Sequence, residues 1–229
     1  MVREETSGTT KTAVAVPIQG ESLPGDLGMP SNPQGVVLFA HGSGSSRHSP
    51  RNQYVARTLE HRNLATLLID LLTPQEEAID DRTAEYRFDI PMLAGRLVTI
   101  VDWLRRYKDT ASLPIGLFGA STGGGAALIA AADRPREIAA VVSRGGRPDL
   151  AGAALLKVTT PTLLIVGGFD ESVIEMNRDA MKRMRGEVKL EIVPGATHLF
   201  EEPGTLERVA DLAGHWFAGH LQPAGARSR

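Results

Sequence analysis

The chain has no cysteine among its 229 residues. A disulfide framework, a thiolate nucleophile and a cysteine-based zinc or iron–sulfur site are therefore excluded. The chain also lacks a run of about 18 apolar residues, the length that a membrane span requires. Its polar start, MVREETSGTTKT, has no apolar core of the kind found in signal peptides. We therefore expect a cytoplasmic protein that has no membrane partner.

No charge of one sign dominates the sequence. The 25 Lys and Arg residues nearly balance 27 Asp and Glu residues, and no basic block is present. A nucleic-acid surface needs clustered positive charge, so no nucleic-acid partner is expected. The six histidines include no pair separated by three residues, the spacing typical of helical zinc ligands. We expect no metal ion and no other cofactor.

Hydrophobic residues make up 42% of the chain, which is enough for one large core. We predict a single domain over residues 12–221 between flexible tails at residues 1–11 and 222–229, because both ends lack periodic apolar positions. The stretch TAVAVPI, which contains Pro17, predicts an edge strand, and PGDLGMPSNPQG predicts a turn-rich link. After this link, short apolar runs alternate with segments of helical spacing. Such alternation indicates an α/β fold with a mostly parallel central sheet and helices on both faces.

A nucleophile elbow is predicted where the apolar run LPIGLF meets a glycine-rich helix start. Gly119, Ala120, Ser121, Thr122 and Gly123 form the pattern G-x-S-x-G between a strand and a helix. A serine on such a sharp turn needs small neighbours, because the strand and the helix nearly touch. The same glycines could instead serve only to pack the helix on the sheet. The pattern by itself leaves both interpretations open.

Two residues at later strand ends favour the catalytic interpretation. Asp170 follows the apolar run LLIVGG, and His198 follows the next strand in VPGATHLF. An imidazole must take the proton of a serine hydroxyl, and a carboxylate must orient that imidazole. The chain order Ser121, Asp170, His198 is the order expected for α/β-hydrolases. Glu171 is an alternative acid, and Glu201 and Glu202 are less favoured because they follow the histidine.

Four stretches carry a resemblance to a known family: FAHGSGSS, GLFGASTGGGAAL, PTLLIVGGFD and PGATHLF. The chain resembles a small α/β-hydrolase of the dienelactone-hydrolase-like group over nearly all of residues 12–221. True dienelactone hydrolases use a cysteine nucleophile, whereas this chain has Ser121. The resemblance implies that the loop after VVLFA donates a backbone N–H to the oxyanion. We assign the oxyanion hole to the amides of Ser43 and Thr122.

The same loop contains residues for which binding or structural roles are expected. Gly42, next to the assigned donor Ser43, is the alternative oxyanion donor and an expected substrate-binding residue. His41 is expected to shape the loop rather than to act as a base. The sequence GSGSSR at residues 42–47 is also one glycine short of a dinucleotide fingerprint, with Asp70 in the place of a ribose-binding acid. This nucleotide interpretation is the weaker alternative, because the fingerprint is incomplete.

The substrate is expected to be a small carboxylic ester or lactone, cleaved through an acyl-enzyme on Ser121. The link between AAVVS and PTLLIV is too short for a lid domain, and the acidic segment 71–87 is a flap, a subunit contact or a solvated loop. Arg47 and Arg144 could bind a substrate carboxylate; like Arg147, they could instead cap helices or pair with acids such as Asp149. A non-catalytic binding protein, a thioester or amide hydrolase, and a homodimer remain open.

Overall fold

A computed structural model describes residues 3–6 and 8–222 of the chain. In this part a nine-stranded sheet has the order β1-β2-β3-β5-β4-β6-β7-β8-β9. The strands from β4 onward pair in parallel, and β1, β2 and β3 add an antiparallel extension. The strands are β1 (Arg3–Thr6), β2 (Thr9–Ile18), β3 (Glu21–Pro30), β4 (Gly35–Ala40), β5 (Leu64–Ile69), β6 (Ile115–Ala120), β7 (Ile138–Arg144), β8 (Thr162–Gly167) and β9 (Val188–Val193).

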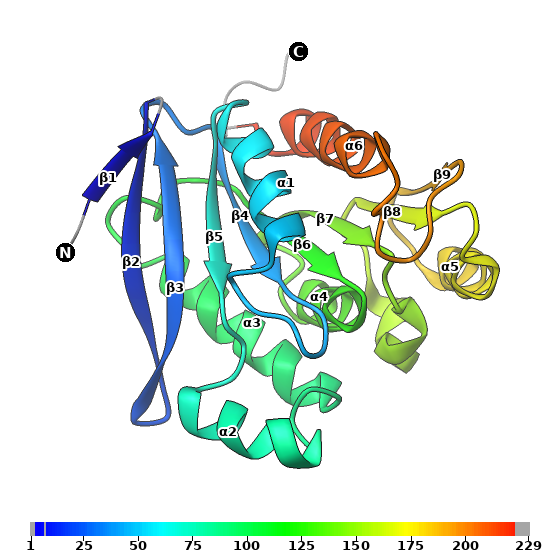
Figure 1. The fold of residues 1–229 in the computed structure, drawn as a ribbon, viewed down its shortest axis with the longest axis horizontal. Helices are drawn as coiled ribbons and strands as arrows, with labels where there is room; N and C mark the ends of the chain where they lie inside the picture. The colour runs from blue at the N-terminus through cyan, green and yellow to red at the C-terminus, as the bar shows by residue number, and fades with distance from the viewer. Residues whose placement is uncertain (1–2, 7, 223–229) are drawn as a thin grey trace.

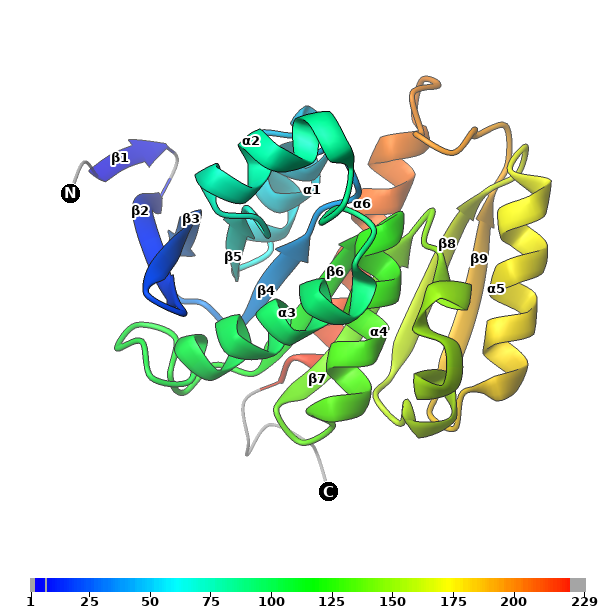
Figure 2. The ribbon, with the colours of Figure 1, turned by 90° about the horizontal axis from the view of Figure 1, so that it is seen from below.

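Helices cover both faces of the parallel strands, as the sequence predicted (Figures 1 and 2). One face carries α1 (Pro50–Glu60) and α6 (Thr205–His220), which contact each other. The other carries α3 (Ile90–Leu104), α4 (Thr122–Asp133), the 3₁₀ segment η1 (Pro148–Lys157) and α5 (Glu171–Arg183). Every residue of β4, β5, β6 and β8 is buried between these layers, which explains their unbroken apolar sequence. No extra lid domain is inserted between β7 and β8.

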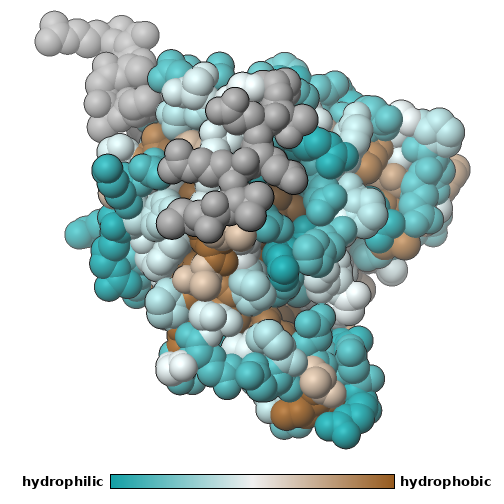
Figure 3. All heavy atoms as spheres, turned by 60° about the vertical axis from the view of Figure 1, so that its left-hand side comes forward, coloured by the Kyte–Doolittle hydropathy of each residue, from teal (hydrophilic) through white to brown (hydrophobic). Residues whose placement is uncertain are grey.

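The N-terminal prediction was wrong at two places. Residues 3–6 and 9–11, assigned to a flexible tail, lie in strands β1 and β2, and most of the predicted turn-rich link is strand β3. The hairpin forms because β2 and β3 pair along their whole length and β3 pairs with β5. Side chains of β2 are largely solvent-exposed or half-buried, and hydrophilic atoms cover much of this side of the molecule (Figure 3). Its sequence therefore lacks the apolar run of a buried strand.

The segment 71–87, expected to be a flap, a subunit contact or a solvated loop, contains helix α2 (Pro74–Thr83). Thr73 and Glu76 form a reciprocal capping box at its start, and Asp80 is bound by Arg87 after its end. These contacts stabilise a helix that has little apolar surface of its own. In the described ranges, no helix is long and apolar enough to cross a bilayer. Residues 223–229 of the predicted C-terminal tail lie outside the described part.

Candidate active site

The turn from β6 into α4 gives Ser121 the strained geometry of a nucleophile elbow. Its backbone has φ 49° and ψ −120°, a combination that residues other than glycine rarely adopt. A Cβ on Gly119 would lie 2.6 Å from the carbonyl oxygen of Gly123, and a Cβ on Gly123 would collide with the backbone of Ala40. The glycines of the motif are thus required by the close approach of strand and helix.

The side chains of Asp170, His198 and Ser121 meet at the carboxyl ends of the parallel strands. Asp170 ends the turn after β8, and His198 lies in the loop after β9. His198 Nδ1 is 2.6 Å from Asp170 Oδ2, and its Nε2 is 3.4 Å from Ser121 Oγ. When Nδ1–H donates to the carboxylate, Nε2 is free to accept the serine proton. The three side chains therefore have the connectivity that acyl transfer requires.

The alternative acids are engaged or placed elsewhere. Glu171 is an exposed residue of the first turn of α5. Glu201 Oε1 accepts a hydrogen bond from Arg51 Nη1 at 3.0 Å, and Glu202 Oε2 accepts one from the Thr197 amide at 3.1 Å. Asp170 is the carboxylate that His198 contacts.

The loop after β4 lies against the nucleophile. A Cβ on Gly42 would be 3.1 Å from the Cβ of Ser121, so Gly42 leaves room beside the serine. The Ser43 amide donates to Thr122 Oγ1 at 2.9 Å, which brings the two assigned oxyanion donors together. In this conformation the Ser43 N–H is occupied by the threonine hydroxyl.

His41 has a structural role in this loop. The Leu71 amide donates to His41 Nε2 at 3.0 Å, so the proton lies on Nδ1, which is 3.0 Å from the Gly42 carbonyl oxygen. Burial lowers the pKa of His41, although its hydrogen bond to Gly42 and the charges of Asp70 and Glu77 oppose the shift. The imidazole is thus held neutral and links the loop to the end of β5.

Two of the three arginines noted in the sequence already have carboxylate partners. The Arg47 amide donates to Asp70 Oδ1 at 2.7 Å, and its guanidinium pairs with both Asp70 and Asp26. Arg47 therefore anchors the loop. Because its guanidinium is already paired with two carboxylates, the structure does not favour the expected role of Arg47 in substrate binding. Arg147 makes a bidentate ion pair with Asp149, in which Nε donates to Oδ1 at 2.9 Å and Nη2 donates to Oδ2 at 2.7 Å.

Arg144, at the end of β7, differs from both. It is 7% exposed, its Nε has no hydrogen-bond partner, and within residues 3–6 and 8–222 it makes no ion pair. Its Cζ lies 5.9 Å from the centre of the Phe200 ring, and its carbonyl oxygen accepts from the Ser121 amide. Burial lowers the pKa of Arg144 to about 10, and the charge of Arg51 adds to the lowering. Arg144 thus combines a buried cation that has no carboxylate partner in the described ranges with a backbone contact to the nucleophile.

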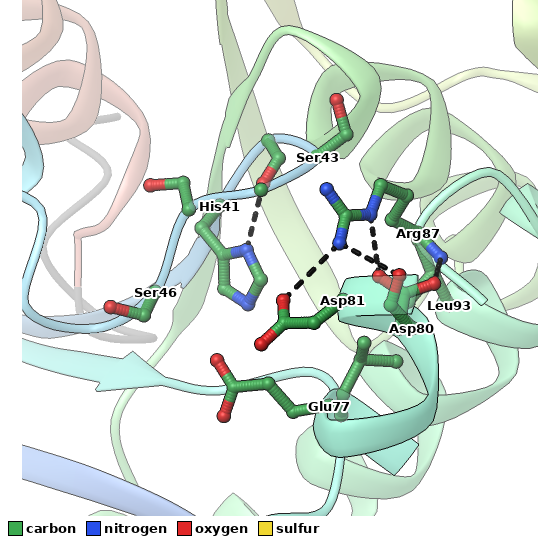
Figure 4. A pocket seen from close by; sticks show the side chains of 12 residues that line it. His41, Ser43, Ser46, Glu77, Asp80, Asp81, Arg87 and Leu93 are labelled. Carbon is green, nitrogen blue, oxygen red and sulfur yellow. Dashed lines mark hydrogen bonds and ion pairs between the residues drawn. The ribbon is translucent and has the colours of Figure 1, made fainter. Parts of the chain in front are cut away.

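A cavity of about 140 Å³ adjoins the oxyanion loop and is closed on its far side by α2 (Figure 4). Its lining includes Ser43, Ser45, Glu77, Asp81 and Arg87. Sequence reasoning did not identify the α2 residues as part of a site. The capping pattern T-P-Q-E at residues 73–76 was a signal for this helix.

Comparison with known proteins identifies the family of this fold. Residues 33–211 match the family described as an alpha/beta hydrolase domain. The chain belongs to this family. It is similar to the crystal structure of a dienelactone hydrolase from Anabaena variabilis, with 58% identity and a TM-score of 0.93, covering 94% of this chain and 100% of that one. This α/β-hydrolase chain is therefore dienelactone-hydrolase-like in sequence and structure.

More distant structures share the fold. Est1E from Butyrivibrio proteoclasticus is 20% identical with a TM-score of 0.75, covering 90% of this chain and 98% of that one. A curated relative from Mycobacterium tuberculosis is 60% identical over 197 residues, 86% of this chain, and carries the provisional name phosphoribosyl transferase. This chain spans 44% of the length of that relative.

Proposed function

We propose that this hydrolase cleaves a small carboxylic ester or lactone through an acyl-enzyme on Ser121. The observation that carries the proposal is the continuous contact from Asp170 through His198 to Ser121, at 2.6 and 3.4 Å. The transferase name of the M. tuberculosis relative describes a protein of which this chain spans 44%, so we assign only hydrolysis to the chain.

In the proposed reaction, Ser121 Oγ attacks the carbonyl carbon while His198 Nε2 takes the hydroxyl proton. The bond between the carbonyl carbon and the alcohol oxygen breaks, and His198 returns the proton to the leaving alcohol. Water then attacks the acyl-enzyme, with His198 again as the base, which releases the acid and restores Ser121. Asp170 holds the imidazole in the required tautomer and stabilises its cation.

The amides of Ser43 and Thr122 are the proposed oxyanion donors. Since the Ser43 N–H donates to Thr122 Oγ1 in this conformation, the substrate oxygen must displace the threonine hydroxyl. One oxyanion donor contributes about 2.7–4 kcal/mol of transition-state stabilisation in a serine hydrolase. Gly42 leaves the space through which the carbonyl oxygen approaches.

The preferred substrate is proposed to carry an anionic group that binds Arg144. This guanidinium lies buried beside the site with an unpartnered Nε, whereas Arg47 and Arg147 are paired. A carboxylate would complete its hydrogen bonds with charge-assisted contacts.

The test is the intact mass of the protein after reaction with a fluorophosphonate, run beside Ser121→Ala. We expect one adduct on the wild type and none on the variant. Absence of an adduct on folded wild type would contradict an activated Ser121 and favour a non-catalytic binding protein. If the wild type is labelled, kcat/KM values for matched ester, lactone, thioester and amide substrates would show which acyl-transfer reaction the enzyme prefers.

A further inference from the structure

The cavity beside the oxyanion loop has the size of a small ring. Its volume is about 140 Å³, close to the roughly 150 Å³ cavity that binds benzene in a model protein. Ser43 lines the cavity and bonds through its amide to Thr122, the residue after the nucleophile. A group in the cavity would therefore lie next to an ester carbonyl held at Ser121.

Most of the charge in the cavity is already paired. Asp80 Oδ1 accepts from the amides of Tyr86 and Arg87 at 2.8 and 2.9 Å, and its Oδ2 accepts from Arg87 Nε at 2.5 Å. Arg87 Nη2 lies 3.4 Å from Asp81 Oδ1. Asp80 is thereby occupied in holding the end of α2, and it is not available to a ligand.

Other polar groups remain available to a ligand. Within the described part of the chain, the Glu77 carboxylate accepts no hydrogen bond and Arg87 Nη1 donates none. Figure 4 shows Glu77 on the His41 side of the cavity and Arg87 with Asp80 on the opposite side. Hydroxyls of the serine-rich loop, including Ser43 and Ser45, complete the lining. The cavity thus offers an acceptor, a donor and hydroxyls that can do either.

This combination distinguishes between classes of ligand. Three carboxylates face one guanidinium, so an anionic group would be repelled. A cationic group could pair with Glu77, but it would leave the Arg87 Nη1 donor without an acceptor, and it would find no Phe, Tyr or Trp ring in the lining. Neighbouring hydroxyls, which donate and accept at once, match the available groups.

We propose that this cavity binds the uncharged, polyhydroxylated alcohol part of the ester, of the size of glycerol or a pentose. The proposal rests on the proposed ester cleavage at Ser121. The hydroxylated alcohol supplies the ester oxygen and leaves with the proton that His198 returns. Glu77 and Arg87 Nη1 select it by hydrogen bonds to different hydroxyls, from opposite sides of the cavity.

The first experiment compares glycerol monoacetate with propyl acetate, which share the acyl group and the carbon chain length of the alcohol. For the wild type we expect kcat/KM to be about tenfold higher for glycerol monoacetate than for propyl acetate, because one charge-assisted hydrogen bond contributes about this factor. Glu77→Met should reduce this ratio to within about twofold of one. Glu85→Met, an exposed site outside the cavity lining, is the matched control and should keep the wild-type ratio.

A second experiment separates binding from chemistry. In Ser121→Ala, D-ribose at millimolar concentration should raise the melting temperature, and Glu77→Met in that background should abolish the rise. Cleavage of both acetates at equal kcat/KM would overturn the cavity proposal and leave ester hydrolysis standing. Failure to cleave either ester, together with no fluorophosphonate adduct, would overturn the proposed function; the ribose measurement alone would then support or overturn the cavity.

Discussion

The two sides of Ser121 differ in the sign of their excess charge and in how far their charged groups are paired. On the side of β7 and the His198 loop, Arg144 is buried over Phe200 without a carboxylate partner. On the side of the oxyanion loop and α2, three carboxylates surround the single guanidinium of Arg87. A substrate that joins an anionic group to a hydroxylated alcohol would bind in one orientation only. If both proposals hold, this contrast would supply a specificity that the nucleophile and its base do not.

The two sides also differ in how they are built. Arg144 ends a strand that pairs with β6 and β8, so its position is fixed by the centre of the sheet. Helix α2 is held by polar contacts, namely its capping box, the ion pair of Glu76 with Arg96 and the pair of Asp80 with Arg87. We infer that the cationic side is rigid, while the hydroxyl-binding side depends on a few ion pairs.

The largest effect is expected for His198, the proposed base for every substrate, whichever side binds it. His198→Ala should lower kcat by about 10⁴-fold or more, because the base is lost while the oxyanion donors remain. The loss should be equal for neutral, carboxylate-bearing and hydroxylated esters in steady-state assays. A loss confined to one substrate class would show that the two sides do not share one nucleophile.

Removing the cation on the β7 side should change specificity. Arg144→Gln should lower kcat/KM for mono-4-nitrophenyl glutarate, relative to 4-nitrophenyl pentanoate, by roughly 10- to 100-fold, the worth of a hydrogen bond to a charged group. Arg147→Gln is the matched control, since that arginine is paired with Asp149. Thermal melting identifies a merely structural arginine, because removing an unpaired buried charge should not lower the melting temperature. An unchanged ratio, or a large loss of stability, would contradict substrate binding at Arg144.

Sequence patterns could predict the parallel core and the side chains at its edge, since buried strands have apolar runs and their ends converge. Ser121, Asp170 and His198 were predicted in this way, and the structure brings their side chains together. Strand β3 was missed because Pro24, Gly25 and Gly28 disfavour a strand locally. Pairing with β2 and β5 outweighs that preference.

The roles of the arginines could not be predicted from local sequence. Arg144 ends a strand and Arg47 and Arg147 follow strand ends, yet only the fold brings Asp70 and Asp26 to Arg47. Among the described residues, Arg144 Nε has no hydrogen-bond partner, and this is a property of the tertiary environment. Helix α2 was misjudged because its stabilising residue, Arg87, lies outside the helix.

A smaller effect is expected when the anchor of α2 is removed. Burial alone would raise the pKa of Asp80, but the amide and guanidinium of Arg87 and the amide of Tyr86 hold it below its ordinary value. Arg87→Met should destabilise the protein by about 1–3 kcal/mol, because a buried acceptor loses its charged donor. It should also reduce the preference for glycerol monoacetate. Urea unfolding near neutral pH measures the first effect; an unchanged free energy of unfolding would show that α2 does not need this ion pair.

The smallest effect is expected for His41, which links the oxyanion loop to the end of β5. Its pKa is lowered from 6.5 by burial, so the unfolded chain binds more protons than the folded one between the folded value and pH 6.5. Stability from His41 is therefore complete above pH 6.5 and is lost as the pH falls through the folded pKa. Protonation of Nε2 would also break the bond from the Leu71 amide.

The free energy of unfolding should fall by at most about 1.4 kcal/mol per pH unit in this window, and His41→Asn should flatten that slope. An equal slope in the variant would assign the pH dependence to other groups and would leave the oxyanion loop without a proton-sensitive link to β5.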